Sequence, residues 1–447
     1  MSPIAVACLS LLAMLGLIWA GMHVAVVLAL VSFVGVWLIR GDMDVAANLL
    51  AQASQDAVAS HIFGVVPLFV LTGFLVARAD VGKDAFEVAN QVLRRVRGGL
   101  GVATVASNAV FAAITGISIA SAAVFTRVAV PEMLRFGYQP RFAVGVVAGS
   151  SVLGMLIPPS LLMILYGFLA NQSVGDLFTA GIVPGLLLAT VYSVGIVLMA
   201  TLRPLAVYAD GAARAVEPAA LLPAGTLVLK LLPSVLLIAS VLGGLYAGFF
   251  TATEAGATGA AVALAVALAV ALLRRKLDWR TLWGVLTETG HVTVSVSFLI
   301  ICATIYTRML AMSGLPQFLV EWMTQLGLGP TGFLLIYIGF IILLGMIIDS
   351  SSILLIVLPL MVPIAEQFGM NLIWLGVVTV VAVEIGLLTP PFGLSVFVIK
   401  STLSDSRISL GDIFRGTLPF TLMMLAVLLL LVFVPQLSLL LLKTPGG

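Results

Sequence analysis

Charged residues are scarce in this sequence: 9% of its 447 residues are Asp, Glu, Lys or Arg, whereas 62% are hydrophobic. Soluble domains carry about a quarter charged residues, so the composition excludes an ordinary soluble protein and indicates a membrane protein. The net charge is +2 and the basic residues are scattered. The sequence therefore contains no basic patch of the kind that binds nucleic acid.

Other absences narrow the function. Cys8 and Cys302 are the two cysteines, and both lie in apolar segments, so no disulfide framework is expected. The sequence has no GxxxxGK[ST] phosphate-binding loop, which a primary pump would need, and no HExxH metal motif. Nor does it show a motif that pairs a catalytic nucleophile with its general base, which an intramembrane enzyme would need. We therefore expect a protein that is not an enzyme.

The apolar runs predict an all-α polytopic membrane protein. They fall near 3–20, 22–39, 61–78, 100–130, 140–170, 181–202, 229–250, 255–273, 291–310, 331–367, 372–400 and 416–442. A helix crosses about 30 Å of hydrocarbon with roughly 20 residues, so the chain is long enough for about ten spans. We read the first run as a retained span, since it lacks the basic region of a signal peptide.

Two of these runs, 100–130 and 331–367, are too long for one span. Small polar residues interrupt each near its middle, at 115–118 (Thr-Gly-Ile-Ser) and 349–352 (Asp-Ser-Ser-Ser). Each half has roughly 12–16 residues, too few to cross the hydrocarbon. We therefore predict two re-entrant helical hairpins, with tips that are buried in protein or line a watery cavity.

The loops predict the orientation. With the N-terminus in the periplasm and both hairpins re-entering, all but three of the 21 Lys and Arg residues fall on the cytoplasmic side. The exceptions are Arg40, Arg308 and Lys443. The opposite orientation would place nearly all of these residues on the wrong side.

The sequence contains a repeat. Adding 232 to a residue number maps LGMLIPPS (153–160) onto IGLLTPPF (385–392), and the polar stretch 115–118 onto 347–350. The first unit enters the membrane from the cytoplasm and the second from outside, so the repeats are inverted. Inverted repeats with interrupted helices are typical of secondary transporters, whose binding sites lie near the membrane midplane.

The paired prolines predict two discontinuous helices. Proline has no N–H and clashes with the carbonyl four residues earlier. We expect the breaks to leave backbone carbonyls without helical partners, and in lipid these require water, a neighbour or a cation. The carbonyls concerned are those of Gly154 and Met155, and of Gly386 and Leu387.

Oxygen-bearing side chains surround both breaks, and oxygen is the ligand that hard cations such as sodium prefer. A sodium ion would suit such oxygens. The predicted first sodium site is Thr115, Gly116, Ser118, Gly154 and Pro158. The predicted second sodium site is Asp349, Ser350, Ser351, Gly386 and Thr389. Helix N-termini at the tips suit an anionic substrate group, and the predicted substrate-binding residues are Ser118, Ser150, Ser352, Pro159 and Pro391.

Several of these residues have structural alternatives. The Ser and Thr hydroxyls are equally suited to bonding a carbonyl of their own helix. Asp349 is either a functional carboxylate at depth or an N-cap of the following helix. Glu254 and Glu384 either bind an ion or hold moving parts together. Arg308 either extends toward the membrane surface or meets a substrate carboxylate.

The chain resembles the large membrane subunit of tripartite ATP-independent periplasmic (TRAP) transporters over nearly its whole length. The segments that carry the resemblance are VAVPEMLRFGYQPRFAVGVVAGSSVLGMLIPPSLLMILYG (128–167), SVGDLFTAGIVPGLL (173–187), TATEAGATGA (251–260), IGLLTPPFG (385–393) and GDIFRGTLP (411–419). One departure concerns the first tip, where the family usually has Ser-Gly-Ser-Ser and this chain has Thr115-Gly116-Ile117-Ser118.

The resemblance implies sodium-coupled uptake of an organic acid across the bacterial inner membrane by an elevator mechanism. It also implies a small four-span membrane subunit and a periplasmic substrate-binding protein as partners, with membrane lipids around the spans. A stand-alone sodium/dicarboxylate symporter of similar architecture is the alternative.

On this basis the chain divides into four parts. We expect N-terminal scaffold helices with a cytoplasmic amphipathic arm in 1–99, and further scaffold helices in 206–330. The first repeat occupies 100–205, with its hairpin at 100–130 and its broken helix at 140–170. The second occupies 331–447, with its hairpin at 331–367 and its broken helix at 372–400.

Overall fold

The computed structural model of the chain describes residues 2–59, 64–211, 221–244, 247, 249, 251–274, 278–403 and 407–442. Within these ranges the elements are helices, and the one β-type pairing is an isolated bridge between Tyr138 and Tyr208. The predicted all-α class is thus confirmed. Arg214, Arg275 and Lys276, which were counted in the orientation argument, lie outside the described residues.

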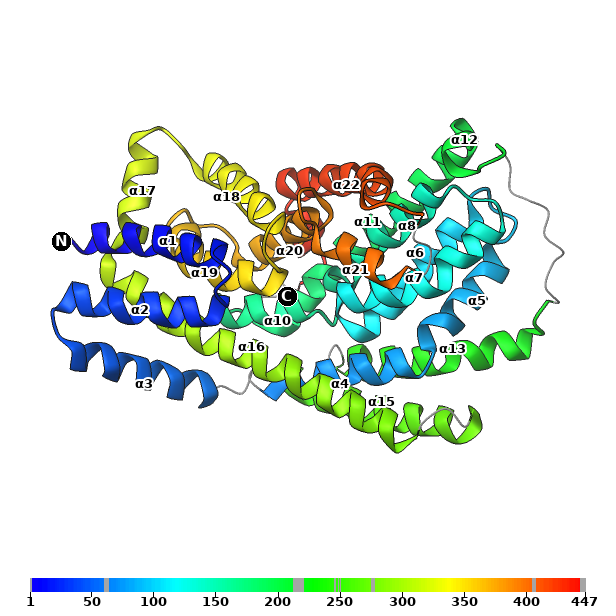
Figure 1. Ribbon diagram of the computed structural model, residues 1–447, viewed down its shortest axis with the longest axis horizontal. Coiled ribbons are helices and arrows are strands. Elements are labelled where there is room, and N and C mark those ends of the chain that lie inside the picture. The colour runs from blue at the N-terminus through cyan, green and yellow to red at the C-terminus, as the bar shows by residue number, and fades with distance from the viewer. Residues whose placement is uncertain are drawn as a thin grey trace.

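The N-terminal third begins with helices that lie together at one end of the elongated molecule (Figure 1). These are α1 (Pro3–Trp19), α2 (Val24–Arg40) and α3 (Met43–Ala59), followed by α4 (Val65–Arg78) and α5 (Val81–Leu93). The first half then contains α6 (Gly99–Thr115), α7 (Ser118–Arg135), α8 (Pro140–Ser151), α9 (Leu153–Leu156), α10 (Leu161–Leu169) and α11 (Val174–Leu202).

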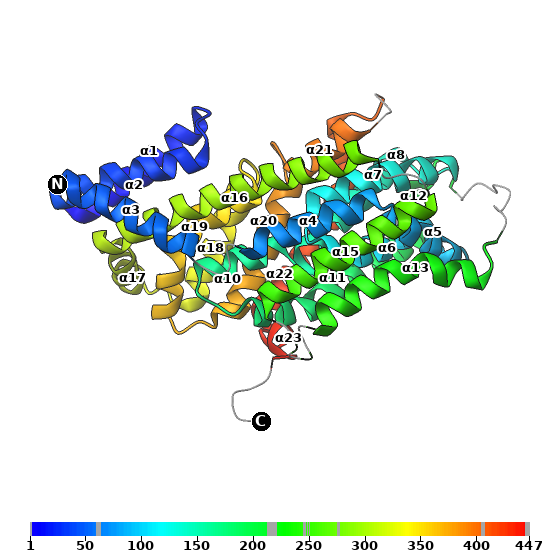
Figure 2. The ribbon, with the colours of Figure 1, turned by 90° about the horizontal axis from the view of Figure 1, so that it is seen from below.

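The three longest helices of the middle of the chain run along one side of the molecule (Figure 1), and α4 packs against the 35-residue helix α16 and against α15 (Figure 2). Its elements are α12 (Pro204–Val207), α13 (Ala224–Ile238), a π-helical turn (Ala239–Gly243), α15 (Ala252–Arg274), α16 (Trp279–Ser313) and α17 (Leu315–Gln325). The second half contains α18 (Pro330–Gly345), α19 (Ser350–Gln367), α20 (Leu372–Leu388), α21 (Leu394–Thr402), α22 (Leu410–Phe433) and α23 (Gln436–Leu439).

Many of these helices are long and apolar enough for a membrane. Of the described helices, five can cross by length and composition, or up to seven if each of two bent pairs forms one span. The bent pairs are α8–α9 with α10, at 42°, and α17 with α18, at 120°. Further apolar helices of 10–17 residues, including α1, α2 and α6, accompany them. The multi-span architecture is therefore confirmed.

The two halves contain the same order of elements. Each has a pair of helices joined by a short break (α6 and α7; α18 and α19), then a helix interrupted at Pro-Pro (α8 to α10; α20 and α21), then a long helix (α11; α22). The paired helices have 16 to 18 residues, slightly longer than predicted but still roughly 24–27 Å in length. Three of the four interruptions lie where the sequence predicts them, whereas the second tip lies at 346–349 instead of 349–352, so the three serines begin α19. The four-part domain division stays a prediction.

Small residues bring the two halves into close contact. Helices α8 and α22 approach so closely that a Cβ atom added to Gly416 would lie 2.0 Å from the carbonyl oxygen of Arg141. Beside this contact, Nε of Arg141 donates to Oδ1 of Asp412 at 2.6 Å. Tyr166 of α10 donates from its buried hydroxyl to the carbonyl of Leu372 at 2.7 Å. The repeats are therefore packed as one body.

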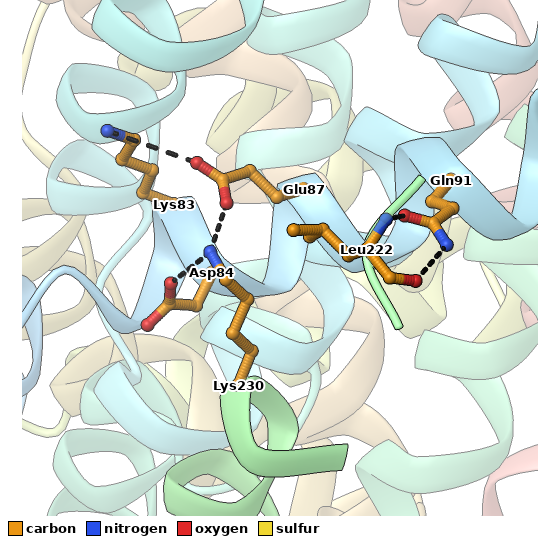
Figure 3. Close-up of polar contacts among 6 residues, drawn as sticks. All are labelled: Lys83, Asp84, Glu87, Gln91, Leu222 and Lys230. Atoms are coloured by element: carbon orange, nitrogen blue, oxygen red, sulfur yellow. Dashed lines mark hydrogen bonds and ion pairs between the residues drawn. The ribbon is translucent and has the colours of Figure 1, made fainter. Parts of the chain in front are cut away.

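A polar cluster joins α5 to α13 (Figure 3). Nζ of Lys230 contacts Oδ1 of Asp84 at 3.1 Å and also bonds Oε2 of Glu87. One helical turn further along, the side-chain amide of Gln91 donates to the carbonyl of Leu222 at 2.9 Å, and the N–H of Leu222 donates back to Oε1 of Gln91 at 3.0 Å. These contacts fix the start of α13 against α5.

Replacing Lys230 with Met should destabilise the protein strongly. The side chain of Asp84 is 7% exposed, and breaking a buried ion pair costs about 3 kcal/mol because one charge is left without its partner. The matched control is Lys83→Met: Lys83 is 53% exposed and lies 3.9 Å from Glu87, so its removal should change stability by about 0.5 kcal/mol or less. Thermal unfolding in detergent compares the two variants, and equal melting temperatures would contradict this assignment.

Candidate functional site

The first hairpin tip packs directly on the first Pro-Pro break. Gly116 has a φ of +65°, and a Cβ atom there would lie 2.4 Å from the carbonyl oxygen of Pro159. Its own carbonyl accepts a hydrogen bond from the N–H of Leu161 at 3.2 Å. From the other side, a Cβ atom on Gly154 would meet backbone atoms of Ile117 and Ser118 at 3.0 Å. Two glycines thus permit backbone to touch backbone where both helices are interrupted.

The sequence predicts that four carbonyls at the breaks lose their helical partner and need another, and two of them find one within the protein. The carbonyl of Met155 accepts a 2.5 Å hydrogen bond from the hydroxyl of Ser160, which also accepts from the N–H of Met163 and so caps α10. The carbonyl of Gly386 accepts from the N–H of Thr389 at 3.0 Å. The sequence reasoning considered only the missing proline N–H groups, and it missed Ser160, which directly follows Pro-Pro.

Several predicted ligand hydroxyls bond their own helices. Thr115 donates to the carbonyl of Phe111 at 2.9 Å, and Thr389 donates to that of Ile385 at 2.6 Å. Ser150 donates to the carbonyl of Val146 at 2.7 Å and accepts from Nδ2 of Asn108 at 2.6 Å. A donating hydroxyl keeps lone pairs that can face a cation. Asn108, a buried amide in an apolar helix, is a site residue that the sequence analysis missed.

A small void lies beside the first tip. It has about 10 Å³ of free space, and its lining includes Thr115, Gly116, Ile117, Pro159 and Ser160. This is close to the minimum space for a single water molecule, and a sodium ion is of similar size. Phe69, Val70, Leu161 and Ile164 complete the lining, so oxygen atoms cover only a small part of it. The first sodium site stays a prediction; two of its residues, Gly154 and Ser118, lie beside this tip.

The first tip is also joined to the second broken helix. The hydroxyl of Ser118 donates to Oε1 of Glu384 in α20 at 3.3 Å, and both residues are buried. Glu384 is 1% exposed, and its Oε2 has no hydrogen-bond partner among the described residues. Of the two interpretations of Glu384, the contact favours a residue that holds parts of the fold together.

The second tip is arranged differently. Asp349 is the N-cap of α19: Oδ2 accepts from the N–H of Ser352 at 3.1 Å and Oδ1 accepts from its hydroxyl at 2.5 Å. Asp349, Ser351 and Ser352 line a cleft of about 460 Å³ that they share with residues 22–24 and one face of α16. The capping interpretation of Asp349 is therefore observed, and its carboxylate also faces a cavity.

The residues proposed for the second sodium site lie on two sides of this tip. The nearest atoms to a Cβ placed on Gly386 belong to Gly345 and Ile342 in α18. The N–H of Phe392, beyond the second break, donates to the carbonyl of Met346 at 3.2 Å. The break thus packs against the end of α18, whereas Asp349 and Ser351 face the cleft. The second site stays a prediction.

The predicted substrate-binding residues are distributed over the same region. Ser118 and Pro159 lie at the first tip, and Ser150 lies behind it against Asn108. Ser352 lines the cleft at the second tip, whereas Pro391 is exposed. The structure thus brings together the first tip with the first break, but it does not gather the five residues at one point.

Two charged residues left open by the sequence have structural partners. Nη2 of Arg308 contacts Oδ2 of Asp56 in α3 at 2.5 Å. The carboxylate of Glu254 accepts from the N–H of Thr251 at 2.8 Å and from its hydroxyl at 3.0 Å, at the start of α15. Arg308 therefore ties α3 to α16, and Glu254 is exposed rather than buried in a site.

Comparison with known proteins decides the family. The family model described as "Tripartite ATP-independent periplasmic transporter, DctM component" matches residues 11–437. The chain belongs to the DctM family. The predicted resemblance is thereby confirmed, and the chain is a transporter permease of the large-subunit type.

Relatives of this permease cover most of its length. It is 35% identical to the C4-dicarboxylate TRAP transporter large permease protein DctM of Pseudomonas aeruginosa, over 84% of each chain. It is 31% identical to the sialic acid TRAP transporter large permease protein SiaM of Vibrio cholerae, over 97% of each. The ectoine TRAP transporter large permease protein TeaC of Halomonas elongata is 28% identical, over 95% of this chain and 96% of that protein.

A solved structure shares the fold. The crystal structure of the Alcanivorax borkumensis YdaH transporter matches the permease with a TM-score of 0.61 and 14% identity, covering 85% of this chain and 88% of that one. At this identity the likeness shows the fold alone.

Replacing Gly116 with Ala should displace the first tip. The added methyl group would clash with the carbonyl of Pro159 at 2.4 Å, whereas Gly369, which has a nearly identical φ of +67°, has nothing within 4 Å. Gly369→Ala is therefore a matched control that carries the backbone strain of about 1–2 kcal/mol without the clash. Gly116→Ala should lower the melting temperature and reduce uptake well beyond Gly369→Ala. Indistinguishable variants would show that tip and break do not need to touch.

Proposed function

We propose that this permease performs sodium-coupled secondary uptake of an organic acid across the bacterial inner membrane by an elevator mechanism, with substrate delivered by a periplasmic binding protein. The observation that carries the proposal is the packing of the first hairpin tip on the Pro-Pro break, at Gly116 and Gly154, beside an ion-sized void. Family membership supports a transporter in a tripartite system.

Sodium coupling is supported by the donors at the first tip. Thr115, Gly116, Pro159 and Ser160 border the void at the first tip, and Ser118 and Gly154 lie beside it. A sodium ion there would join hairpin to broken helix, so its binding would favour the closed arrangement of the two. Substrate and ion would then be carried together.

The elevator mechanism is supported by contacts between the halves. Ser118 bonds Glu384, Tyr166 bonds Leu372, and α8 packs tightly on α22. These contacts join the first hairpin to both broken helices, and the second hairpin packs on the second broken helix where Gly345 meets Gly386. Such a body is the unit that an elevator mechanism moves against the remaining helices. The N-terminus would lie in the periplasm, as the Lys and Arg distribution predicts.

The cargo and partners are inferred from the relatives. Their names specify C4-dicarboxylates, sialic acid and ectoine, all of which carry carboxyl groups. An organic acid is therefore the proposed substrate class. A small four-span membrane subunit and a periplasmic binding protein would complete the transporter, consistent with the tripartite family.

Reconstitution distinguishes this proposal from a stand-alone sodium/dicarboxylate symporter. Proteoliposomes are prepared with the permease, its small subunit and its binding protein. They should accumulate a labelled C4-dicarboxylate when sodium is present outside. Omission of either partner, or replacement of sodium with potassium, should abolish accumulation. Uptake by the permease alone would support the symporter instead.

Substitutions test the ion sites. Ser118→Ala and Thr389→Val should each raise the sodium concentration for half-maximal uptake about tenfold, which corresponds to about 1.4 kcal/mol for one lost ligand. Ser193→Ala is the control, because Ser193 lies in α11 outside both predicted sites and its hydroxyl bonds the carbonyl of Ala189 2.8 Å away. Unchanged sodium dependence in normally expressed Ser118 and Thr389 variants would refute the two assignments.

A further inference from the structure

The end of the molecule opposite α1–α3, where α5 and α12 lie (Figure 1), carries a group of arginines. Three belong to the turns that join α5 to α6, and the fourth lies between α11 and α12. They are Arg94, Arg95, Arg97 and Arg203. Backbone hydrogen bonds of 2.9 Å close the turns, from the N–H of Val96 to Leu93 and from that of Gly99 to Val96. The first three arginines are thus carried by defined turns.

Two contacts hold the segment after α5 against the segment after α11. The N–H of Gly98 donates to the hydroxyl of Tyr208 at 2.9 Å. A Cβ atom on Gly98 would lie 2.9 Å from Cγ2 of Ile196 and 3.2 Å from Cβ of Ala200, in the last turns of α11. The arginines of the two segments therefore flank one junction, although 110 positions separate Gly98 from Tyr208.

Exposed apolar side chains lie next to these arginines in the chain. Val92 is 67% exposed, Leu202 is 76% exposed and Leu205 is 69% exposed. Apolar and basic side chains on one surface suit the boundary between lipid headgroups and acyl chains, where arginine keeps its stem on apolar surface and its charge among the headgroups. We call the four arginines together with Val92, Leu202 and Leu205 the basic edge.

The charges of the basic edge have no counterion within the part of the chain that the structure describes. No side chain there forms an ion pair or hydrogen bond with any of the four arginines, whereas Arg141 and Lys230 pair with carboxylates of other helices. Segments 92–98 and 202–210 contain one acid, Asp210, which leaves an excess of positive charge. An orientation signal needs only basic residues in a loop. Here the charges of two segments also meet beside exposed apolar side chains.

We propose that the basic edge binds an anionic phospholipid, with the arginines contacting its phosphate and the three apolar side chains contacting its acyl chains. Guanidinium groups match phosphate geometry with paired N–H donors. Because α6 begins at Gly99, a headgroup bound at 94–97 holds the base of the first hairpin at the membrane surface. This site goes beyond the proposed function and does not depend on it.

Native mass spectrometry of the full-length permease, released from detergent, counts bound phospholipids directly. Phosphatidylglycerol and phosphatidylethanolamine with the same acyl chains are titrated in turn. Phosphatidylglycerol should bind with an apparent Kd about tenfold lower or more, because it alone carries a net charge that the arginines attract. Raising the ionic strength from about 0.1 M to about 1 M should weaken its binding, since the Debye length falls from about 10 Å to about 3 Å.

Matched variants locate the site. Arg94→Gln/Arg95→Gln should raise the apparent Kd for phosphatidylglycerol about 25-fold, because each basic residue near an anionic lipid contributes a factor of about five. Arg280→Gln/Arg415→Gln removes the same charge from two exposed arginines on separate helices outside the basic edge, and it should leave this Kd within about twofold. Thermal unfolding checks each variant, and Arg97→Gln/Arg203→Gln replaces the first pair if that pair does not fold.

Inorganic phosphate distinguishes a lipid site from a site for free anions. At about 10 mM it should leave phosphatidylglycerol binding unchanged, because it has no acyl chains to contact the apolar side chains. Displacement by phosphate would overturn the lipid assignment. Equal binding of the two phospholipids would overturn the requirement for negative charge, and equal affinity in the edge and control variants would overturn the location.

Discussion

The structure depends on one constraint: backbone that leaves the helix at membrane depth must find hydrogen-bond partners inside the protein. In the first half the interrupted segments satisfy each other. The carbonyl of Gly116 accepts from the N–H of Leu161, and the carbonyl of Met155 accepts from the hydroxyl of Ser160. The Gly116–Leu161 bond joins the tip to the break, whereas the Met155–Ser160 bond lies within the break, so the first of these bonds keeps the two segments together. The absence of Cβ atoms at Gly116 and Gly154 allows this approach.

The same constraint connects the two halves. Ser118, the first residue of α7, donates to Glu384 near the C-terminal end of α20, so the tip of one repeat reaches the broken helix of the other. Tyr166 makes a second such link, to the carbonyl of Leu372. Buried polar groups are costly to separate once they are paired. A body held in this way moves more easily as a unit than in pieces, which is the basis for the proposed elevator mechanism.

Much of this architecture follows from local chemistry in the sequence. Proline pairs end helices and small polar residues mark the tips, so the breaks at 116–117, 157–160 and 389–393 occur where they are predicted. The sequence did not predict contacts between residues that are far apart along the chain. Asp56 and Arg308 are 252 positions apart, and nothing in the apolar pattern pairs them. Ser160 was missed because only the missing proline N–H groups were considered, and not the side chains that could donate in their place.

The repeat gave a wrong prediction where the two halves differ. The 232-residue offset predicts that the second tip meets Gly386 as the first meets Gly154, but Gly386 packs against Gly345 instead. The second tip presents Asp349 and its serines to a cleft whose other walls come from residues 22–24 and 291–299. Those walls have no counterpart in the repeat, so the offset could not predict them. The first tip therefore borders a small void, whereas the second borders the larger cavity.

The central claim is that an ion joins the first hairpin to the first broken helix. A cryo-electron microscopy map of the complete transporter in sodium, compared with one in potassium, tests it most directly. The account predicts density in sodium between residues 115–118 and 154–160, absent in potassium, where the tip should move away from the break. Identical maps without density at this position would contradict it.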